Sequence, residues 1–333
     1  MKNKLFSIIK VVFFLGLGIL IIWLVAKNLT EEQKQQVYQS LKGADYTWVV
    51  LSIAIGIISN ISRAVRWKML LKPLGHSPRL SNTFFAVMIG YLANLAVPRL
   101  GEISRCGVLT RYEKIPFNQS FGTVITERII DVLVLLLIFI ITFFLESEKI
   151  YHYTIQTIVT PLKNKISGNH SFVYGGCVIL IAIVVVVLIA RKKTESNSLL
   201  SKIKTLLLGF WEGIKSIKNI ENPALFIAHS LFIWLMYYFS VYVCFYCFED
   251  TSKLSASAAL VLLAFGSIAA IITPGGIGAY PVIAAEVLSL YDIPLPIGFA
   301  FGWVVWLSQE ILLIILGLAS LVLTPILNKK DSL

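Results

Sequence analysis

Long apolar runs constrain this chain more than any other feature of its sequence. An α-helix needs about 20 mostly apolar residues to cross the hydrocarbon core of a bilayer. The sequence is 57% hydrophobic and 14% charged, whereas soluble domains are about 25% charged. Its apolar segments lie near 5–26, 47–71, 82–97, 119–145, 172–190, 224–248, 256–272 and 297–324. These lengths predict an all-α, polytopic membrane protein.

Two of the apolar runs end in residues that break a helix. Pro98 and Gly101 follow the run at 82–97, and a glycine-rich turn follows the run at 256–272. The residues of this second turn are Pro274, Gly275, Gly276 and Gly278. At membrane depth, helix breaks are tolerated only where the freed backbone groups meet protein, water or a ligand. Because paired breaks in corresponding places indicate a transporter site, we interpret both as hinges beside a binding site.

The distribution of lysine and arginine predicts how the chain threads through the membrane. Basic residues of short loops stay on the cytoplasmic side. Threading the apolar segments in order places 21 of the 29 basic residues on that side, including every arginine except Arg128. We therefore expect a multi-pass protein of a bacterial-type inner (plasma) membrane, with both the N-terminus and the C-terminus in the cytoplasm.

The same threading turns the two broken segments into re-entrant hairpins. Residues 82–112 have basic residues at both ends and must enter and leave from the cytoplasm. Residues 256–291 lie between acidic loops and must enter and leave from outside. An Ile-Pro pair follows each hairpin, at 115–116 and 293–294, and precedes a long helix. We predict about six full spans and two broken helical hairpins, arranged as an inverted repeat.

This plan makes residues 1–333 a single transmembrane domain. The first half covers about 1–150 and the inverted second half about 165–333, and an amphipathic linker at about 194–222 is predicted to lie on the inner leaflet. The net charge of +11 does not indicate nucleic acid binding, because the basic residues are spread over short segments between spans. Membrane lipids, in particular anionic phospholipids, are the expected partners.

The residues around the first break form one candidate site. The break frees backbone amides at the start of the next helix, where about half a positive charge favours an anion. Arg99 and Arg105 add guanidiniums that bind phosphate through paired hydrogen bonds. Asn94 precedes the break, and Glu102 is placed to pair with Arg105 or to cap the helix. We expect these residues to contact an anionic head group; alternatively, the charges only neutralise one another and hold the hairpin together.

The long helix after the first hairpin carries a second candidate site. Glu127 and Asp131 share a face, and Arg128 is placed to pair with Asp131. Each charge costs about 2.5–3.5 kcal/mol on membrane insertion scales, so the group is expected to line a polar interior. Glu127 has the fewest obvious partners, and we interpret it as a head-group contact or a titrating group, with an ion-pair network as the alternative. Arg63 is either an interfacial anchor or a guide for the head group.

The second half offers fewer polar groups. The glycines of its break permit a sharp turn and a close approach of the backbone, for a ligand or simply for tight packing. Glu286 and Glu310 are isolated carboxylates in apolar surroundings. With Glu127, they are the candidates for coupling transport to protons.

The sequence shows no enzyme motif. It has no nucleophile–base pair, zinc-ligand spacing, P-loop or dinucleotide fingerprint. Among its four cysteines, Cys244 and Cys247 are interpreted as buried thiols that pack as small hydrophobes. We therefore expect no enzyme activity, no cofactor and no metal site.

Four motifs spread over the chain carry a family resemblance. They are Arg63-x-x-Arg66-Trp67, Pro98-Arg99-x-Gly101-Glu102-x-x-Arg105, Thr126-Glu127-Arg128-x-x-Asp131 and Pro274-Gly275-Gly276-Ile277-Gly278. Together they resemble the transmembrane, flippase-like region of lysylphosphatidylglycerol synthases. In fused members that region is thought to move an aminoacylated phospholipid between leaflets, while a soluble domain attaches lysine. We expect a stand-alone member without the soluble domain. Many relatives carry an acidic residue just after the glycine-rich turn, where this chain has Ala279-Tyr280-Pro281.

The leading functional hypothesis is a lipid transporter of flippase type. It would translocate an anionic or modified phospholipid, or a polyprenyl-phosphate lipid, across the inner membrane. A transporter or channel for a small anion is the first alternative, because it uses the same helix-end chemistry. The second is a membrane accessory of a lipid-modifying or glycosyl transferase, without transport of its own, which implies a membrane enzyme as partner.

Overall fold

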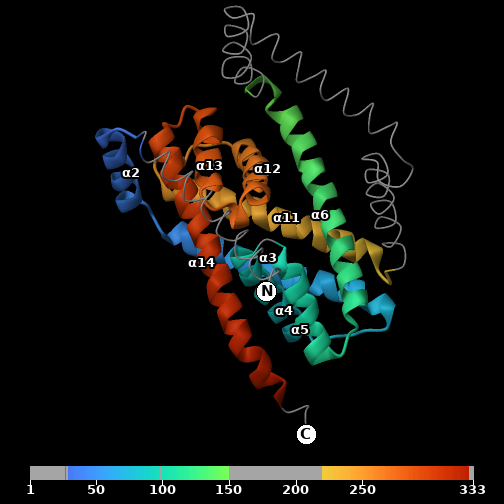
Figure 1. Ribbon diagram of the computed structural model, residues 1–333. Coiled ribbons are helices and arrows are strands. Elements are labelled where there is room, and N and C mark those ends of the chain that lie inside the picture. Colours follow the sequence, from blue (N-terminus) through green and yellow to red (C-terminus); the bar gives the residue numbers. More distant parts are fainter. Residues whose placement is uncertain (1–26, 28, 98, 150–219, 330–333) are drawn as a thin grey trace, which may run out of the picture.

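The computed structural model describes residues 27, 29–97, 99–149 and 220–329 (Figure 1). All regular elements in this part of the chain are helices, and it contains no strand. The predicted spans at 5–26 and 172–190 lie outside the described residues, as does most of the predicted linker at 194–222.

The helices follow the apolar segments of the sequence closely. The α-helices are α2 (Glu31–Gly43), α3 (Thr47–Leu71), α4 (Leu80–Ala96), α5 (Leu100–Glu113), α6 (Phe117–Leu145), α11 (Pro223–Cys244), α12 (Ala256–Ile272), α13 (Ala279–Ser289) and α14 (Leu295–Leu327). Short 3-10 turns follow α3, α11 and α12 as η1 (Lys72–Leu74), η4 (Phe245–Cys247) and η5 (Pro274–Gly276). In the described part of the chain, four helical stretches, built on α3, α6, α11 and α14, are long and apolar enough to cross a membrane. The predicted all-α, polytopic membrane fold is confirmed.

Both predicted helical hairpins are present. Helices α4 and α5 fold back on one another across a break at residues 97–99, and α12 and α13 do so across η5. In Figure 1, α3 and α11 cross the middle of the molecule, with α4 and α5 on one side of them and α12 and α13 on the other. The tips of the two hairpins meet there, because a Cβ atom on Gly275 would lie 2.8 Å from Leu95 Cδ2.

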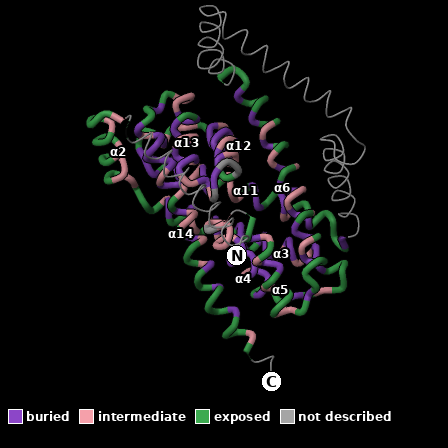
Figure 2. Tube along the Cα trace, in the orientation of Figure 1, coloured by how far each residue is buried: buried purple, intermediate pink, exposed green. Residues whose placement is uncertain are grey.

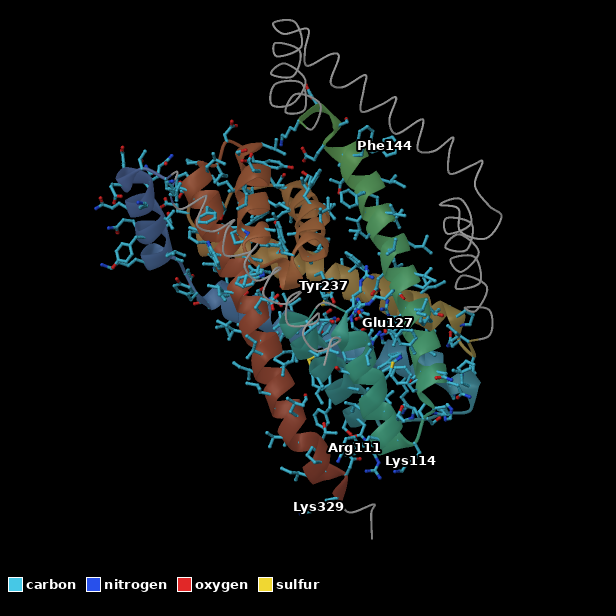
Figure 3. All side chains as sticks on the ribbon, viewed as in Figure 1. Arg111, Lys114, Glu127, Phe144, Tyr237 and Lys329 are labelled. Carbon is cyan, nitrogen blue, oxygen red and sulfur yellow. The ribbon has the colours of Figure 1, made fainter. Side chains whose placement is uncertain are left out.

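The two hairpins open toward opposite ends of the molecule. At the open end of the first, Asn82 Nδ2 donates to Glu113 (2.6 Å) and to Asn328 beyond α14 (2.8 Å). At the open end of the second, the Lys149 ammonium lies 4.0 Å from the centre of the Tyr291 ring. Figure 3 shows Arg111, Lys114 and Lys329 at one end and Phe144 at the other. The two hairpins are therefore inverted with respect to one another, as predicted, and the side of the membrane to which each opens stays a prediction.

Proline begins the long helix that follows each hairpin. Pro116 is the N-cap of α6, and Pro294 is the N-cap of α14. Because proline lacks an N–H group and its φ is fixed, it suits the start of a helix. The repeated order of hairpin, Ile-Pro pair and long helix is therefore confirmed.

Small residues bring the helices into close contact. A Cβ atom on Gly302 would lie 2.6 Å from the Pro281 Cα, and one on Gly317 would lie 2.7 Å from the Leu92 Cβ, so α14 packs closely on both α13 and α4. Such contacts are typical of helices in lipid, where packing rather than water exclusion drives association. The outer faces of α6 and α14 keep large apolar side chains exposed, including Phe144 and Val322 (Figure 2). These faces are suited to lipid.

Candidate functional site

A buried group of charges joins α3 to α6. Arg63 and Arg66 are three residues apart on α3, and Glu127 and Asp131 are four apart on α6, so each pair occupies one helix face. Arg63 Nη1 donates to Glu127 Oε1 (2.9 Å) and to Asp131 Oδ2 (2.8 Å). Arg66 Nη2 donates to Glu127 Oε1 (2.8 Å), and its Nη1 lies 2.8 Å from Asp131 Oδ1. Two guanidiniums and two carboxylates are thus interlocked.

The first hairpin supplies a third guanidinium. Arg105 Nη1, from α5, lies 2.9 Å from Glu127 Oε2. The same guanidinium stacks 4.6 Å above the ring of Trp67, whose indole N–H donates to Thr123 (2.9 Å). Arg63, Arg66, Arg105, Glu127 and Asp131, here named the charged cluster, are all buried. Figure 3 places Glu127 near the middle of the molecule, between its two ends.

The charged cluster carries one net positive charge, because three guanidiniums face two carboxylates. Removing charges from water is expensive, and breaking a buried pair by removing one partner costs about 3–5 kcal/mol. The cluster also retains unused donors: Arg63 Nε and both Nε and Nη2 of Arg105 are buried and have no hydrogen-bond partner among the described residues. Unpaired buried donors with excess positive charge suit a phosphate or another anion.

A second, more exposed ion pair lies beside the cluster. Arg128 Nη2 donates to Glu102 Oε1 (3.1 Å), and its Nη1 lies 3.9 Å from Asp131 Oδ2. The Arg128 side chain is 41% exposed. Glu102 was expected to pair with Arg105 or to cap α5, and the structure instead pairs it with Arg128. The reason is that Arg105 points toward Glu127.

Two sequence-based interpretations need correction. Glu127 was taken as the carboxylate with the fewest partners, yet three arginines surround it in the ion-pair network that was the stated alternative. Of the two interpretations of Arg63, the interfacial anchor is wrong, because Arg63 is buried against Glu127 and Asp131; its role as a guide for a head group stays a prediction. Sequence reasoning compared each charge only with neighbours on its own helix. The spacing of Arg63 and Arg66, matched by that of Glu127 and Asp131 on another span, was the signal that pairs the two helices.

The first break is held by residues next to it. Asn94 Oδ1 accepts the amide N–H of Gly101 (2.7 Å), so one of the freed amides is already occupied. A Cβ atom on Gly101 would lie 2.1 Å from the carbonyl oxygen of Gly90, so α4 and α5 touch backbone to backbone. Arg99 caps α5 in a left-handed conformation (φ 68°) and is exposed, outside the charged cluster. Pro98 lies outside the described residues.

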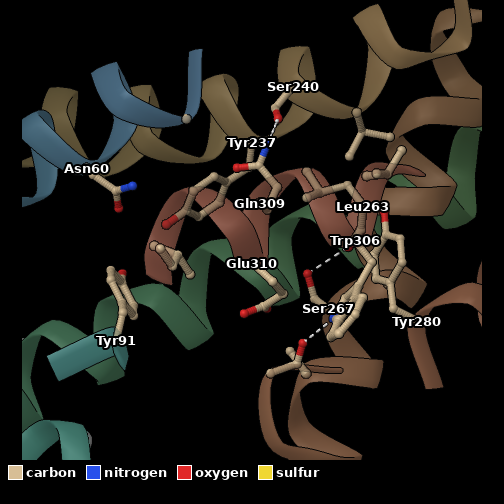
Figure 4. Close-up of a pocket in the computed structure, with 17 residues that line it drawn as sticks. Asn60, Tyr91, Tyr237, Ser240, Leu263, Ser267, Tyr280, Trp306, Gln309 and Glu310 are labelled. Carbon is tan, nitrogen blue, oxygen red and sulfur yellow. Dashed lines mark hydrogen bonds between the residues drawn. The ribbon is translucent and has the colours of Figure 1, made fainter. Parts of the chain in front are cut away.

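A cavity of about 270 Å³ lies next to the charged cluster. Tyr91 and Tyr237 line it, and the Arg63 guanidinium lies 6.0 Å from the ring centre of each. Arg63 Nη2 also donates to the Tyr237 hydroxyl (3.0 Å). The wall is formed by residues of α3, α4, α11, α12, α13, α14 and η5, so both hairpins contribute (Figure 4). Tyr91 and Tyr237 therefore lie between the cavity and the charged cluster.

The second break forms one side of this cavity. Gly275, Gly276 and Gly278 have φ values of 61°, 78° and 71°, a conformation that glycine adopts without strain. The indole N–H of Trp306 donates to the Gly275 carbonyl (2.7 Å). Glu310, four residues further along α14, points into the cavity, and its Oε2 has no hydrogen-bond partner among the described residues (Figure 4).

Glu286 does not join this site. It was expected in apolar surroundings, and the structure places it on the exposed face of α13. That helix buries Ala284, Ala285, Val287 and Leu288, which leaves Glu286 on the outside. No group of three or more histidine, cysteine or acidic residues suited to a metal ion occurs in the described part of the chain.

Sequence reasoning missed the contacts that tie the two halves together. The side-chain amide of Gln309 donates to the hydroxyls of Ser52 and Ser240 (3.1 Å each), which joins α14 to α3 and α11. Tyr91 and Tyr237 were also missed. Single serines and tyrosines in apolar helices carry no spacing signal, so only the three-dimensional packing identifies them.

Comparison with known proteins places this arrangement in a family. The UPF0104 membrane protein MJ1595 of Methanocaldococcus jannaschii is 25% identical over 300 residues, covering 85% of this chain and 87% of that protein. The glycosyltransferase AglD of Haloferax volcanii is 28% identical over 99 residues, covering 29% of this chain and 16% of that protein. No solved structure matches. Residues 7–317 match the profile of the lysylphosphatidylglycerol synthase TM region, and the chain therefore belongs to that family.

Proposed function

We propose that this protein moves a lipid with an anionic head group between the two leaflets of the membrane. An anionic or modified phospholipid, or a polyprenyl-phosphate lipid, has the required chemistry. The head group would meet the charged cluster, and the hydrocarbon tails would remain in the bilayer. The observation that carries this proposal is the buried excess of positive charge beside the cavity to which both hairpins contribute.

The position of the charges supports transport rather than a surface role. A net positive group buried at the middle of a membrane protein is costly, and such groups usually line the path of a substrate or ion. A structural ion-pair network needs no excess charge and no unused donors, whereas Arg105 keeps two. Glu102 and Arg128 are less buried and offer a second contact on the way to the cluster.

The orientation in the membrane belongs to the same proposal. Arg111, Lys114 and Lys329 share one end of the molecule (Figure 3). Positive residues favour the cytoplasmic side, so we assign this end to the cytoplasm of a bacterial-type inner membrane. The distribution of basic residues along the sequence leads us to propose the cytoplasm for both chain termini as well. The first hairpin then opens to the cytoplasm and the second to the outside.

Lipid movement in liposomes tests the proposal. Purified protein is reconstituted with a fluorescent anionic phospholipid, and the fraction accessible to an external quencher is followed over time. We expect the wild-type protein to expose inner-leaflet lipid. Arg105→Gln should slow this at least about tenfold, because a hydrogen bond to a charged group contributes about 1.5–3 kcal/mol.

The matched control is Arg111→Gln on the same helix. Arg111 is exposed, and its guanidinium lies against the neighbouring Tyr112 ring. This variant should move lipid at the wild-type rate. Equal rates for the Arg105 and Arg111 variants, with both proteins folded, would remove the charged cluster from the mechanism.

A small anion is the alternative cargo with the same chemistry. Release of a trapped anion from the same liposomes, without movement of labelled lipid, would identify the protein as an anion transporter or channel. The partial similarity to a glycosyltransferase favours a second test, for a role as accessory to an enzyme. Co-purification of a transferase with a protein that moves neither lipid nor anion would support that role.

A further inference from the structure

Glu310 differs from the other carboxylates at the centre of the molecule because it has no cationic partner in the described part of the chain. Glu127 and Asp131 are each within 2.9 Å of two or more guanidinium nitrogens. The Glu310 Oε2 is buried without a hydrogen-bond partner among the described residues. Among the residues that the structure describes, no lysine, arginine or histidine lines the cavity into which Glu310 points.

The groups that face Glu310 across the cavity are neutral. Its titratable neighbours are three tyrosines, Tyr91 from α4, Tyr237 from α11 and Tyr280 from α13. Helices α3 and α12 contribute uncharged residues, including Asn60 and Ser267, and α2, which also packs on α14, contributes no residue to the wall. The guanidinium of Arg63 lies on the far side of Tyr91 and Tyr237. Within the charged cluster it is already paired with Glu127.

The residues of the second break carry no charged side chain. A Cβ atom on Gly275 would lie 3.2 Å from Glu310 Oε1, so the carboxylate lies against the turn that follows the C-terminal end of α12. The nearest indole donor, Trp306 Nε1, is already bound to the Gly275 carbonyl and does not serve the carboxylate.

An unpaired carboxylate is therefore disfavoured here. Burying an isolated ionised group is far more costly than burying a neutral one. A proton bound to Glu310 removes the charge, needs no further ligands and supplies a hydroxyl donor. A metal ion would need several oxygen ligands, and the described residues provide no group of three acidic or histidine side chains.

We propose that Glu310 is a proton-binding site that couples lipid movement to protons. This inference rests on the proposed function and deepens it. With its proton, Glu310 leaves the excess positive charge of the charged cluster available to an anionic head group. Without the proton, the Glu310 carboxylate offsets the positive charge of the charged cluster and repels an anionic head group. The proton and the head group therefore enter together, and Glu310 touches the hinge glycine of one hairpin while the cluster holds the other hairpin.

Infrared difference spectroscopy of the whole protein tests proton binding without reference to transport. A protonated carboxylic acid has a carbonyl stretch that disappears on ionisation. We expect this band at neutral pH in the wild-type protein, its loss in Glu310→Gln, and its retention in Glu249→Gln, which changes an exposed carboxylate. A band that persists in Glu310→Gln overturns the proposal. A band that sodium ions displace at constant pH overturns the assignment to protons.

A labelling measurement covers the case in which Glu310→Gln does not fold. A hydrophobic carbodiimide adds to protonated buried carboxyl groups, and mass spectrometry locates the adduct. Wild-type protein should be labelled at Glu310, less so as the pH rises. Labelling confined to other carboxylates contradicts the proposal.

Transport under an imposed pH gradient separates this inference from the proposed function. Wild-type protein should move anionic lipid faster with the gradient, and Glu310→Gln should lose that acceleration while the Glu249→Gln control keeps it. If the protein binds the proton at Glu310 but moves no lipid, the proposed function is refuted, whereas the assignment of Glu310 as a proton-binding site still holds. Gradient-dependent lipid movement that survives in Glu310→Gln refutes the coupling alone.

Discussion

At the scale of single residues, the neighbours of a buried carboxylate determine whether it forms ion pairs or binds a proton. Glu127 contacts Arg63, Arg66 and Arg105 from two other helices. Its carboxylate therefore holds three guanidiniums that would otherwise repel one another inside the membrane. Glu310, on α14, has no such partner among the described residues. The two carboxylates are thus suited to different roles, one structural and electrostatic, the other proton-binding.

Removing the charge of Glu127 should destabilise the protein. In Glu127→Gln, three buried guanidiniums face Asp131 alone, and the expected loss is about 3–5 kcal/mol in the free energy of unfolding. Glu32→Gln on the exposed face of α2 is the control, and its effect should stay within about 0.5 kcal/mol. Reversible unfolding in mixed micelles measures both. Equal stability of the two variants would show that the cluster does not depend on Glu127.

At the scale of elements, the sequence predicts the helices well and their partners poorly. The apolar runs at 47–71 and 256–272 coincide with α3 and α12, because a membrane span must be long, apolar and internally hydrogen-bonded. Both breaks were also predicted, since proline and glycine act locally. The pairing of Arg63 with Glu127 was not, because it joins side chains 64 positions apart, and nothing local specifies which helices face each other.

The first hairpin offers a matched pair of glycines for testing its packing. A Cβ atom on Gly101 would lie 2.1 Å from the Gly90 carbonyl oxygen, whereas one on Gly107 of the same helix would meet nothing within 4 Å. Gly101→Ala should force α4 and α5 apart and cost about 1–3 kcal/mol. Gly107→Ala should be neutral or stabilise the helix by up to about 1 kcal/mol. Thermal unfolding of both variants checks this, and the reverse order would contradict the observed contact.

At the scale of the whole molecule, two hairpins of opposite orientation meet at the cavity, next to the charged cluster. The charged cluster comes from the first half alone, whereas the cavity takes Tyr91 from the first hairpin and Gly275 and Tyr280 from the second. Hydrogen bonds from the Gln309 side chain join α14 to α3 and α11 next to the cavity. A site shared between halves can change its access when one half moves against the other, as in transporters built from inverted repeats.

The orientation of the hairpins can be measured by labelling single cysteines from each side of the membrane. In a background without native cysteines, Lys114→Cys should react with an impermeant reagent only from the cytoplasmic side. Asp292→Cys, at the open end of the second hairpin, should react only from outside. If both positions react from the same side, the inverted arrangement does not hold in the membrane.

The central claim is that the charged cluster binds an anionic lipid head group. Native mass spectrometry of the purified protein, with its retained lipids identified, tests this most directly. The account predicts that the wild-type protein and Arg111→Gln retain an anionic lipid, while Arg105→Gln loses it. Equal retention in all three proteins, or retention of uncharged lipids alone, would contradict the account.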